Sequence, residues 1–399
     1  MSQKWIHKPS KNLIIIVSFV IAIAALVGVY FIGLNVGDGK LSLGGRGLNG
    51  QLPNTLDYAS VTAEYRALVD NYDGKITATE LLNGMKHGMA NALGDPYTEY
   101  FTAKEASQFN SELNNSFIGI GAELSVNSQK ELVIVSPLSG SPAAKAGLEP
   151  NDVINDINGR STANMTINQA VNLIRGKSGT QVVLTILRGG KTLSFTITRS
   201  NIVIPSVSYK ILNGNIGYIS IISFASDTSG LIQKAAHYMV NNHVKGIILD
   251  LRDNPGGLVT AAVATSSEWL QPGQEIMQER RGNVVEHTYT ATGGDILHGI
   301  PTVVLVNGGS ASASEITAGA LHDNHDAYII GTKTFGKGVV QQLIELGGGA
   351  ALKVTVASWY RPDGQDIEHI GITPDKTVVL SSNGSDNQLL AAEQYLAAH

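Results

Sequence analysis

A long apolar run covers residues 13–34 and contains no charged residue. About 20 apolar residues are enough to cross a bilayer as a helix, so this run predicts a transmembrane anchor. Lys4, Lys8 and Lys11 precede it, and positive charge stays on the cytoplasmic side of a membrane. We therefore expect a cytoplasmic N-terminus at 1–12 and an extracytoplasmic body held by a single membrane pass. A cleavable signal peptide is the alternative, although the run is long for one.

The residue pattern beyond this run predicts a tether, a helical segment and a β-rich segment. Residues 35–54 are rich in glycine, which is typical of a flexible linker. Residues 55–114 have helical spacing, and residues 115–200 consist of short strand patterns with two helices and a hairpin. In the helical segment one face is apolar and is expected to be buried: Leu81, Leu82, Met85, Met89 and Leu93.

Residues 201–380 alternate between β-branched runs and helical patterns, which is typical of an α/β domain. A final amphipathic helix is predicted at 381–399. The whole chain therefore predicts a multidomain protein of mixed α+β and α/β class, with an N-terminal helical segment and one transmembrane helix.

A sharp turn separates a buried strand from a helix within the α/β region. The strand at 302–306 runs into Asn-Gly-Gly, where glycine tolerates the positive φ of a tight turn. The helical pattern that follows begins with closely spaced serines: Ser310, Ser312 and Ser314. Free N–H groups at a helix N-terminus can stabilise an oxyanion, so the turn is a candidate site for a nucleophilic serine.

Lys337 is a candidate base for such a serine. It lies between two glycines, and Phe335, Val339 and Val340 are its apolar neighbours. A lysine amine acts as a base only when it is neutral, so burial must lower its pKa by several units from about 10.4. The apolar neighbours favour such burial.

The motifs GSASASEI, TFGKG, VVQQ and LDLRDNPGG resemble those of the carboxyl-terminal processing peptidases, which are serine proteases with a Ser–Lys dyad. In that family the nucleophile is the middle serine of the tract, and the lysine follows 25 positions later, as Lys337 follows Ser312. The resemblance therefore selects Ser312. It also assigns Gln341, four residues after the lysine, to orienting the lysine amine.

The resemblance further implies the fold and the groups around the dyad. Backbone N–H groups of Ala313 and of one glycine, Gly256 or Gly257, would form the oxyanion hole. The core would be crotonase-like (the ClpP/crotonase type) with an inserted PDZ domain, and GDPYTEYF at 94–101 would be a structural turn. The chain would be a serine endopeptidase that needs no metal or other cofactor.

Residues 115–200 resemble a PDZ domain of the bacterial protease type. PDZ domains bind a peptide C-terminus by strand addition, and backbone N–H groups of an apolar loop receive the carboxylate. Arg175 is a candidate for coupling this domain to the active site, which the PDZ domain gates in the family. The candidate carboxylate loop is FIGIG: Phe117, Ile118, Gly119, Ile120 and Gly121. The alternative is that this stretch is simply a strand that contains glycines.

The net charge and the cysteine content limit the kinds of binding partner and crosslink that the chain is expected to have. The net charge is −5 and the sequence pI is near 6.1, so nothing indicates a nucleic-acid partner. The chain has no cysteine and hence no disulfide. The expected partners are protein or peptide substrates with free C-termini, the membrane and, by resemblance, a second copy of the chain in a homodimer.

Two alternatives stay open. One is a Ser-His-Asp hydrolase, because histidines and aspartates lie near the serine tract: His322, His325, His369, Asp323 and Asp326. His322 is about 15 Å along a helix from Ser312 at 1.5 Å per residue, which is too far for direct contact. The other is a membrane-tethered PDZ adaptor with an inactive peptidase fold.

Overall fold

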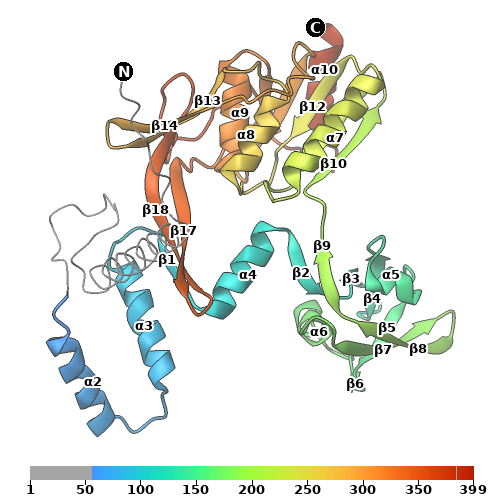
Figure 1. The fold of residues 1–399 in the computed structure, drawn as a ribbon. Helices are drawn as coiled ribbons and strands as arrows, with labels where there is room; N and C mark the ends of the chain where they lie inside the picture. Colours follow the sequence, from blue (N-terminus) through green and yellow to red (C-terminus); the bar gives the residue numbers. More distant parts are fainter. Residues whose placement is uncertain (1–55, 383) are drawn as a thin grey trace, which may run out of the picture. The chain divides into compact units, whose positions relative to one another are not determined.

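A computed structural model describes residues 56–382 and 384–399 (Figure 1). The predicted cytoplasmic segment at 1–12, anchor at 13–34 and linker at 35–54 lie outside these residues. Contacts divide the chain into two units, 1–81 and 82–399. The described part of the first unit is helical and consists of α2 (Ala59–Asn71) and the beginning of α3 (Ala78–Asn91).

A six-stranded sheet forms the centre of the second unit. β10 pairs antiparallel with β11, and the remaining neighbours are parallel. β12 and β15 are buried at every position, as uninterrupted apolar runs predict for strands covered on both faces. In sheet order the strands are β10 (Val207–Leu212), β11 (Ile216–Ile221), β12 (Gly246–Asp250), β15 (Thr302–Val306), β16 (Tyr328–Gly331) and β19 (Lys376–Thr377).

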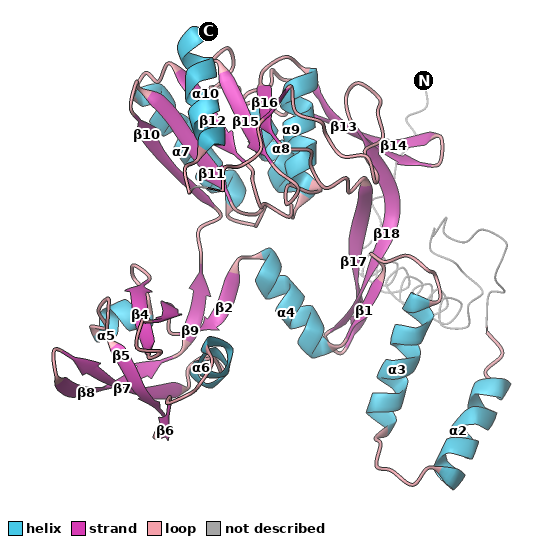
Figure 2. Ribbon diagram, turned by 180° about the vertical axis from the view of Figure 1, so that it is seen from behind, coloured by secondary structure: helices cyan, strands magenta, loops and turns pink. Residues whose placement is uncertain are grey.

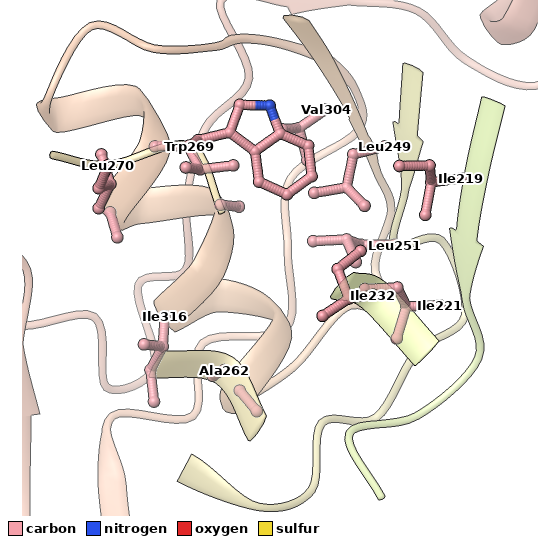
Figure 3. Packing of buried hydrophobic residues seen from close by; sticks show 14 of the residues in the cluster. Ile219, Ile221, Ile232, Leu249, Leu251, Ala262, Trp269, Leu270, Val304 and Ile316 are labelled. Atoms are coloured by element: carbon pink, nitrogen blue, oxygen red, sulfur yellow. The ribbon is translucent and has the colours of Figure 1, made fainter. Parts of the chain in front are cut away.

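Helices cover both faces of this sheet. One face packs against three helices around Trp269, whose Nε1 donates to Thr302 Oγ1 (2.9 Å) and whose indole lies near Leu249 and Val304 (Figure 3). The other face packs against α10 through Leu396 and its neighbours. The helices are α7 (Thr228–Asn241), α8 (Val259–Ser267) and α9 (Ala313–Asp323) on the first face and α10 (Asn387–Ala398) on the second.

A five-stranded antiparallel sheet carries the long hairpin of β17 and β18 (Figure 2). β18 pairs with β17 along one side and with β1 and β13 along the other. The helix α4 (Ala103–Leu113) packs on this sheet through Ala106, which contacts Phe101 and Ala351. The strands are β1 (Glu99–Phe101), β13 (Glu275–Arg281), β14 (Val284–Thr290), β17 (Val339–Gly347) and β18 (Ala350–Tyr360).

The segment that resembles a PDZ domain has its own sheet and apolar core. As predicted, a short helix ends at Gly147, which has φ 86°, and a hairpin turns at Gly189 and Gly190. A separate two-stranded sheet, β2 with β9, connects this segment to the rest. The elements are β2 (Ser116–Gly119), β3 (Ala122–Val126), β4 (Leu132–Pro137), α5 (Pro142–Ala146), β5 (Val153–Ile157), β6 (Arg160–Ser161), α6 (Ile167–Ile174), β7 (Gln181–Arg188), β8 (Lys191–Thr198) and β9 (Ser200–Val203).

Two expectations for the helical segment need correction. Residues 99–101 form a strand, β1, because they pair with β18. The apolar face of α3 is helical as predicted but not buried: Leu82, Met85 and Met89 are 40–58% exposed, since no other described segment covers them. Throughout 56–382 and 384–399, no helix has both the length and the apolar character that a membrane crossing requires.

Candidate active site

Ser312 lies at the junction of a strand and a helix, as the sequence predicts. β15 ends at Val306, and α9 begins at Ala313. Ser312 has φ 53° and ψ −114°, a conformation that is rare for residues with a Cβ. Its N–H donates to Glu315 Oε2 (2.9 Å), and this bond helps to hold the strained turn in place.

The structure distinguishes Ser312 from the serines beside it. Ser310 is buried, and its hydroxyl donates to the Leu251 carbonyl (2.7 Å). Ser314 is also buried, and its hydroxyl donates to the Asn254 carbonyl (2.9 Å). Ser312 is half-buried and lines a cavity of about 760 Å³. Of the three serines, Ser312 therefore has access to a space of substrate size.

The turn after β12 brings Gly256 against the serine turn. A Cβ on Gly256 would lie 2.7 Å from the Ala311 carbonyl oxygen and 2.9 Å from Ser312 Cβ, so this close approach requires glycine. The N–H of Gly256 donates to Asn254 Oδ1 (2.9 Å). This N–H is therefore already engaged within the turn.

The N–H of the neighbouring Gly257 is not used in the bridge to Phe224. Phe224 donates its N–H to the Gly256 carbonyl (2.8 Å) and accepts from the Leu258 N–H (2.7 Å). In such a parallel bridge the N–H of the residue in between, Gly257, points away from Phe224. Ala313 is the first residue of α9, where N–H groups have no partner within the helix. Gly257 and Ala313 are thus the pair of donors that the geometry favours.

The carboxylate of Glu315 connects the serine turn to the lysine segment. Glu315 is fully buried and accepts from the N–H of Ser312 (2.9 Å) and of Lys337 (3.0 Å) through the same oxygen. Its other oxygen accepts from the Gly336 N–H (2.8 Å) and the Thr334 hydroxyl. One acceptor therefore fixes both backbones. The sequence reasoning missed this residue, although a serine followed three positions later by glutamate is a capping-box signal.

The side chain of Lys337 lines the same cavity as Ser312. Burial lowers the pKa of its amine, and the positive charge of Lys353 lowers that pKa further. The carboxylates of Glu368 and Asp95 act in the opposite direction, but the pKa remains below its ordinary value. A lowered pKa increases the neutral fraction of the amine, and a general base must be neutral.

The Lys337 amine lies over an aromatic ring. Its Nζ is 4.9 Å from the centre of the Tyr97 ring. Its carbonyl accepts from Trp359 Nε1 (2.9 Å), so the backbone at the lysine is fixed. Within the described residues, no hydrogen bond joins this amine to Ser312. The backbones of Ser312 and Lys337 are held by Glu315, but no hydrogen bond joins their side chains in the described part of the chain.

Gln341 lies in β17 and lines this cavity as well. Its Nε2 is buried and has no hydrogen-bond partner among the described residues. An unpaired buried donor costs free energy, so this amide is available to a group that enters the cavity. Apolar side chains complete the lining, among them Phe224, Ile316 and Val340.

The five residues of the predicted carboxylate loop do not form one loop. Phe117, Ile118 and Gly119 lie in β2 and pair with β9. Ile120 is buried, its carbonyl accepts from the Ala143 N–H (2.8 Å), and Gly121 turns the chain with φ 73°. A bend therefore exists only at the end of FIGIG, because pairing with β9 makes the first part a strand.

Arg175 stays within the PDZ-like segment. It follows α6, is exposed, and its guanidinium lies 5.1 Å from the centre of the Phe117 ring. This contact joins α6 to β2. It gives Arg175 a packing role, and coupling to the active site stays a prediction.

The histidines of the region lie elsewhere. His322 contacts Asp323 (2.9 Å) and Asp375 (3.1 Å), and the hydrogen bond to Asp323 is the main reason why its pKa is raised. His322 and His325 line a different cavity. His369 has a side chain that is 83% exposed. Among the residues that the structure describes, none of the histidines lines the cavity of Ser312.

Comparison with known proteins places the chain in a family. A profile of peptidase family S41 matches residues 215–378, and a PDZ domain profile matches residues 133–188. A probable CtpA-like serine protease of Staphylococcus aureus is 36% identical over 381 residues, which are 94% of this chain and 74% of that protein. This chain belongs to peptidase family S41.

The chain is also similar to other proteins. A probable CtpA-like serine protease of Staphylococcus epidermidis is 38% identical over 315 residues, or 79% of this chain, so the chain spans only 64% of that protein's length. A putative S41 protease of Bacteroides fragilis has a similar fold, with a TM-score of 0.55 and 17% identity over 87% of this chain and 99% of that structure. The photosystem II D1 C-terminal processing protease is 28% identical, with a TM-score of 0.49 over 79% of this chain and 86% of that structure.

Proposed function

We propose that this S41 family member is a serine endopeptidase of the C-terminal processing type with Ser312 and Lys337 as its dyad. The observation that carries the proposal is the Glu315 carboxylate, which ties the backbones of both residues together at one cavity. The lowered pKa of Lys337 and the access of Ser312 to the cavity agree with it.

Acylation begins when the side chain of Lys337 turns from Tyr97 to Ser312. The neutral amine takes the hydroxyl proton as Oγ forms a bond to the scissile carbonyl carbon. The negative charge that moves to the carbonyl oxygen is stabilised by the N–H groups of Gly257 and Ala313. The C–N bond then breaks, and the Lys337 ammonium returns its proton to the leaving amine.

Deacylation repeats these steps with water. Neutral Lys337 takes a proton from water, whose oxygen attacks the ester carbonyl of the acylated Ser312. The same N–H groups stabilise the second oxyanion, and Ser312 leaves with the proton. Gln341, which lines the same cavity, orients the lysine amine in both halves by accepting from it through its amide oxygen.

The PDZ domain is proposed to bind the free C-terminus of a protein substrate and to gate the dyad. The bend at Ile120 and Gly121 offers backbone groups for the terminal carboxylate, and Arg175 is the coupling candidate. A single-pass anchor at 13–34 would hold this body on the extracytoplasmic side of the membrane. The crotonase-like core follows from the family resemblance, and the exposed face of α3 is available to a second copy in a homodimer.

The Ser-His alternative is disfavoured by geometry. His322 is engaged by Asp323 and Asp375 and faces another cavity. The alternative of an inactive adaptor is disfavoured because Ser312, Lys337, Gln341 and the proposed oxyanion donor Gly257 line one cavity.

Cleavage of an unstructured polypeptide with small apolar C-terminal residues tests this proposal. The full chain is purified in mild detergent, and products are followed by mass spectrometry for wild type, Ser312→Ala, Lys337→Ala and His322→Ala. We expect both dyad variants to lose about 10⁶-fold in rate and His322→Ala to retain most of the wild-type rate. Cleavage that survives Lys337→Ala but not His322→Ala would replace the dyad by a Ser-His pair. Binding without cleavage by the wild type would favour the adaptor.

A further inference from the structure

Tyr97 contacts Lys337 although 240 positions separate the two residues. It belongs to the segment GDPYTEYF, which the family resemblance treats only as a structural turn. A cation within about 6 Å of an aromatic ring centre is attracted to the ring, whereas a neutral amine is not attracted in this way. At 4.9 Å, the Tyr97 ring therefore favours the protonated form of Lys337.

The backbone at Tyr97 is held by hydrogen bonds. The Tyr97 N–H donates to Asp95 Oδ1 (3.0 Å), and the hydroxyl of buried Thr98 donates to Asp95 Oδ2 (2.6 Å). Thr98 in turn accepts from the Thr355 N–H of β18 (3.1 Å). The same strand provides Trp359, which holds the Lys337 carbonyl. The backbones at Tyr97 and Lys337 are thus attached to one strand.

Several charged groups face the Lys337 amine. Glu368, which accepts from the Gly338 N–H, and Asp95 both favour the ammonium. Lys353 on β18 disfavours it, as does burial. Glu368 also lies beside the Tyr97 hydroxyl, and burial together with the nearby carboxylates raises the pKa of that hydroxyl. Glu315 on α9 is occupied by its four donors.

We propose that Tyr97 is a positioning residue whose ring binds the protonated amine of Lys337 and holds it away from Ser312. The dyad forms when the amine loses its proton and leaves the ring. The inference rests on the proposed function of the dyad. The contact with Tyr97 then sets the lower pH limit of the reaction, because a lysine that the ring keeps protonated cannot act as the base.

The pH dependence of kcat/KM in full-length variants tests the proposed role of the Tyr97 ring. Tyr97→Leu removes the ring, so the ammonium loses a favourable contact and the acid limb moves to lower pH by about 0.5 to 1 unit. Tyr97→Phe keeps the ring, so its acid limb stays near that of the wild type. Tyr97→Met is a second ringless variant, used beside Tyr97→Leu in case the leucine variant unfolds.

A second readout measures the lysine without catalysis. Acetic anhydride acetylates neutral amines. In a Ser312→Ala background, mass spectrometry measures the extent of acetylation of Lys337 at each pH, with the exposed Lys333 as the reference. The midpoint pH of Lys337 acetylation is expected to fall in Tyr97→Leu and Tyr97→Met and to stay unchanged in Tyr97→Phe. Unchanged midpoints in both ringless variants would overturn the proposal, as would an equal shift in Tyr97→Phe. If the wild type cleaves nothing, the proposed dyad is refuted, whereas the acetylation measurement still tests the effect of the Tyr97 ring on Lys337.

Discussion

Glu315 is a buried charge whose two oxygens each accept two hydrogen bonds. A buried carboxylate is tolerated when its oxygens are bonded in this way, and it then restrains every group that donates to it. Among its donors are the backbones of Ser312 and Lys337. The strained serine turn and the lysine segment therefore depend on one side chain.

The variant Glu315→Gln tests this dependence. An amide presents NH₂ to N–H donors where the acid presented oxygen, so we expect the free energy of unfolding to fall by about 2–4 kcal/mol. We also expect kcat to fall, because both backbones lose their common acceptor. Urea unfolding and peptide hydrolysis measure the two effects. Glu345→Gln, at an exposed position of β17, is the matched control and should change neither; equal effects of the two variants would contradict the role of Glu315.

Gly257 provides a second test at a single residue. It has φ 141°, and a Cβ there would lie 2.2 Å from the Phe224 carbonyl oxygen. We expect Gly257→Ala to lower the free energy of unfolding by about 3 kcal/mol or more and to abolish hydrolysis. Gly299→Ala is the control, since its φ of 76° is also positive but open space surrounds it; strain alone should cost about 1 kcal/mol. Similar melting temperatures for the two variants would refute the steric argument.

A strand, a glycine turn and a helix start form a local pattern from which the sequence predicted the serine turn. The choice of Ser312 and Lys337 came from the motif spacing of the family resemblance and stays a prediction. The sequence could not choose between Gly256 and Gly257, since the choice depends on the Asn254 side chain that engages one N–H. Nor could it find Tyr97, whose contact with Lys337 arises only from pairing between β1 and β18.

At the scale of elements, α6 depends on a buried arginine. Arg199 donates to the carbonyls of Ile174 (2.6 Å), Leu173 (3.1 Å) and Gln181 (2.6 Å). The first two carbonyls lie at the C-terminal end of α6, where unpaired acceptors and the helix dipole favour a cation. One side chain thus attaches this helix to the sheet of the PDZ domain.

We expect Arg199→Met to leave these carbonyls buried without donors and to destabilise the PDZ domain by about 3 kcal/mol. Hydrogen exchange measured by mass spectrometry on the full chain should show faster exchange in α6 and β7, with little change in the central sheet. Arg160→Met replaces an exposed arginine of the same domain and serves as control. Unchanged exchange in α6 would show that packing alone holds the helix.

Elements with a regular pattern were predicted well, and those defined by distant pairing were not. The buried strands β12 and β15 and the hairpin of β7 and β8 follow from apolar runs and paired glycines. β1 became a strand because β18 supplies a partner that a local pattern does not reveal. FIGIG has a strand-like pattern, and pairing with β9 makes its first part the strand that was the alternative to the carboxylate loop.

At the scale of the whole molecule, Arg252 connects the central sheet to the C-terminal helix. It pairs with Asp250 at the end of β12 (2.6 Å) and with Asp386 at the start of α10 (2.8 Å). Its Nη1 also donates to Gln388 Oε1 (3.0 Å). The hydrogen bond from Arg252 is the main reason why the pKa of Asp386 is lowered.

This shift predicts a pH-dependent contribution to stability. Because the pKa of Asp386 is lower in the folded state, its ionised form stabilises the fold above the unfolded pKa of about 3.9, and this stabilisation disappears as pH falls through the folded value. Asp386→Asn should therefore have a lower urea midpoint than wild type at pH 6, and the difference should shrink as pH falls below about 3.9. The exposed Asp73→Asn is the control. A difference that grows on acidification would contradict the pairing.

Labelling with a fluorophosphonate shows whether Ser312 is a nucleophile that Lys337 activates. The full chain is treated at neutral pH, digested, and the modified residue is identified by mass spectrometry in wild type and in Lys337→Ala. We predict one adduct, on Ser312, whose rate of formation falls strongly without the lysine, because the hydroxyls of Ser310 and Ser314 are buried and bonded to carbonyls. An adduct on Ser310 or Ser314, or undiminished labelling of Ser312 in Lys337→Ala, would contradict the account.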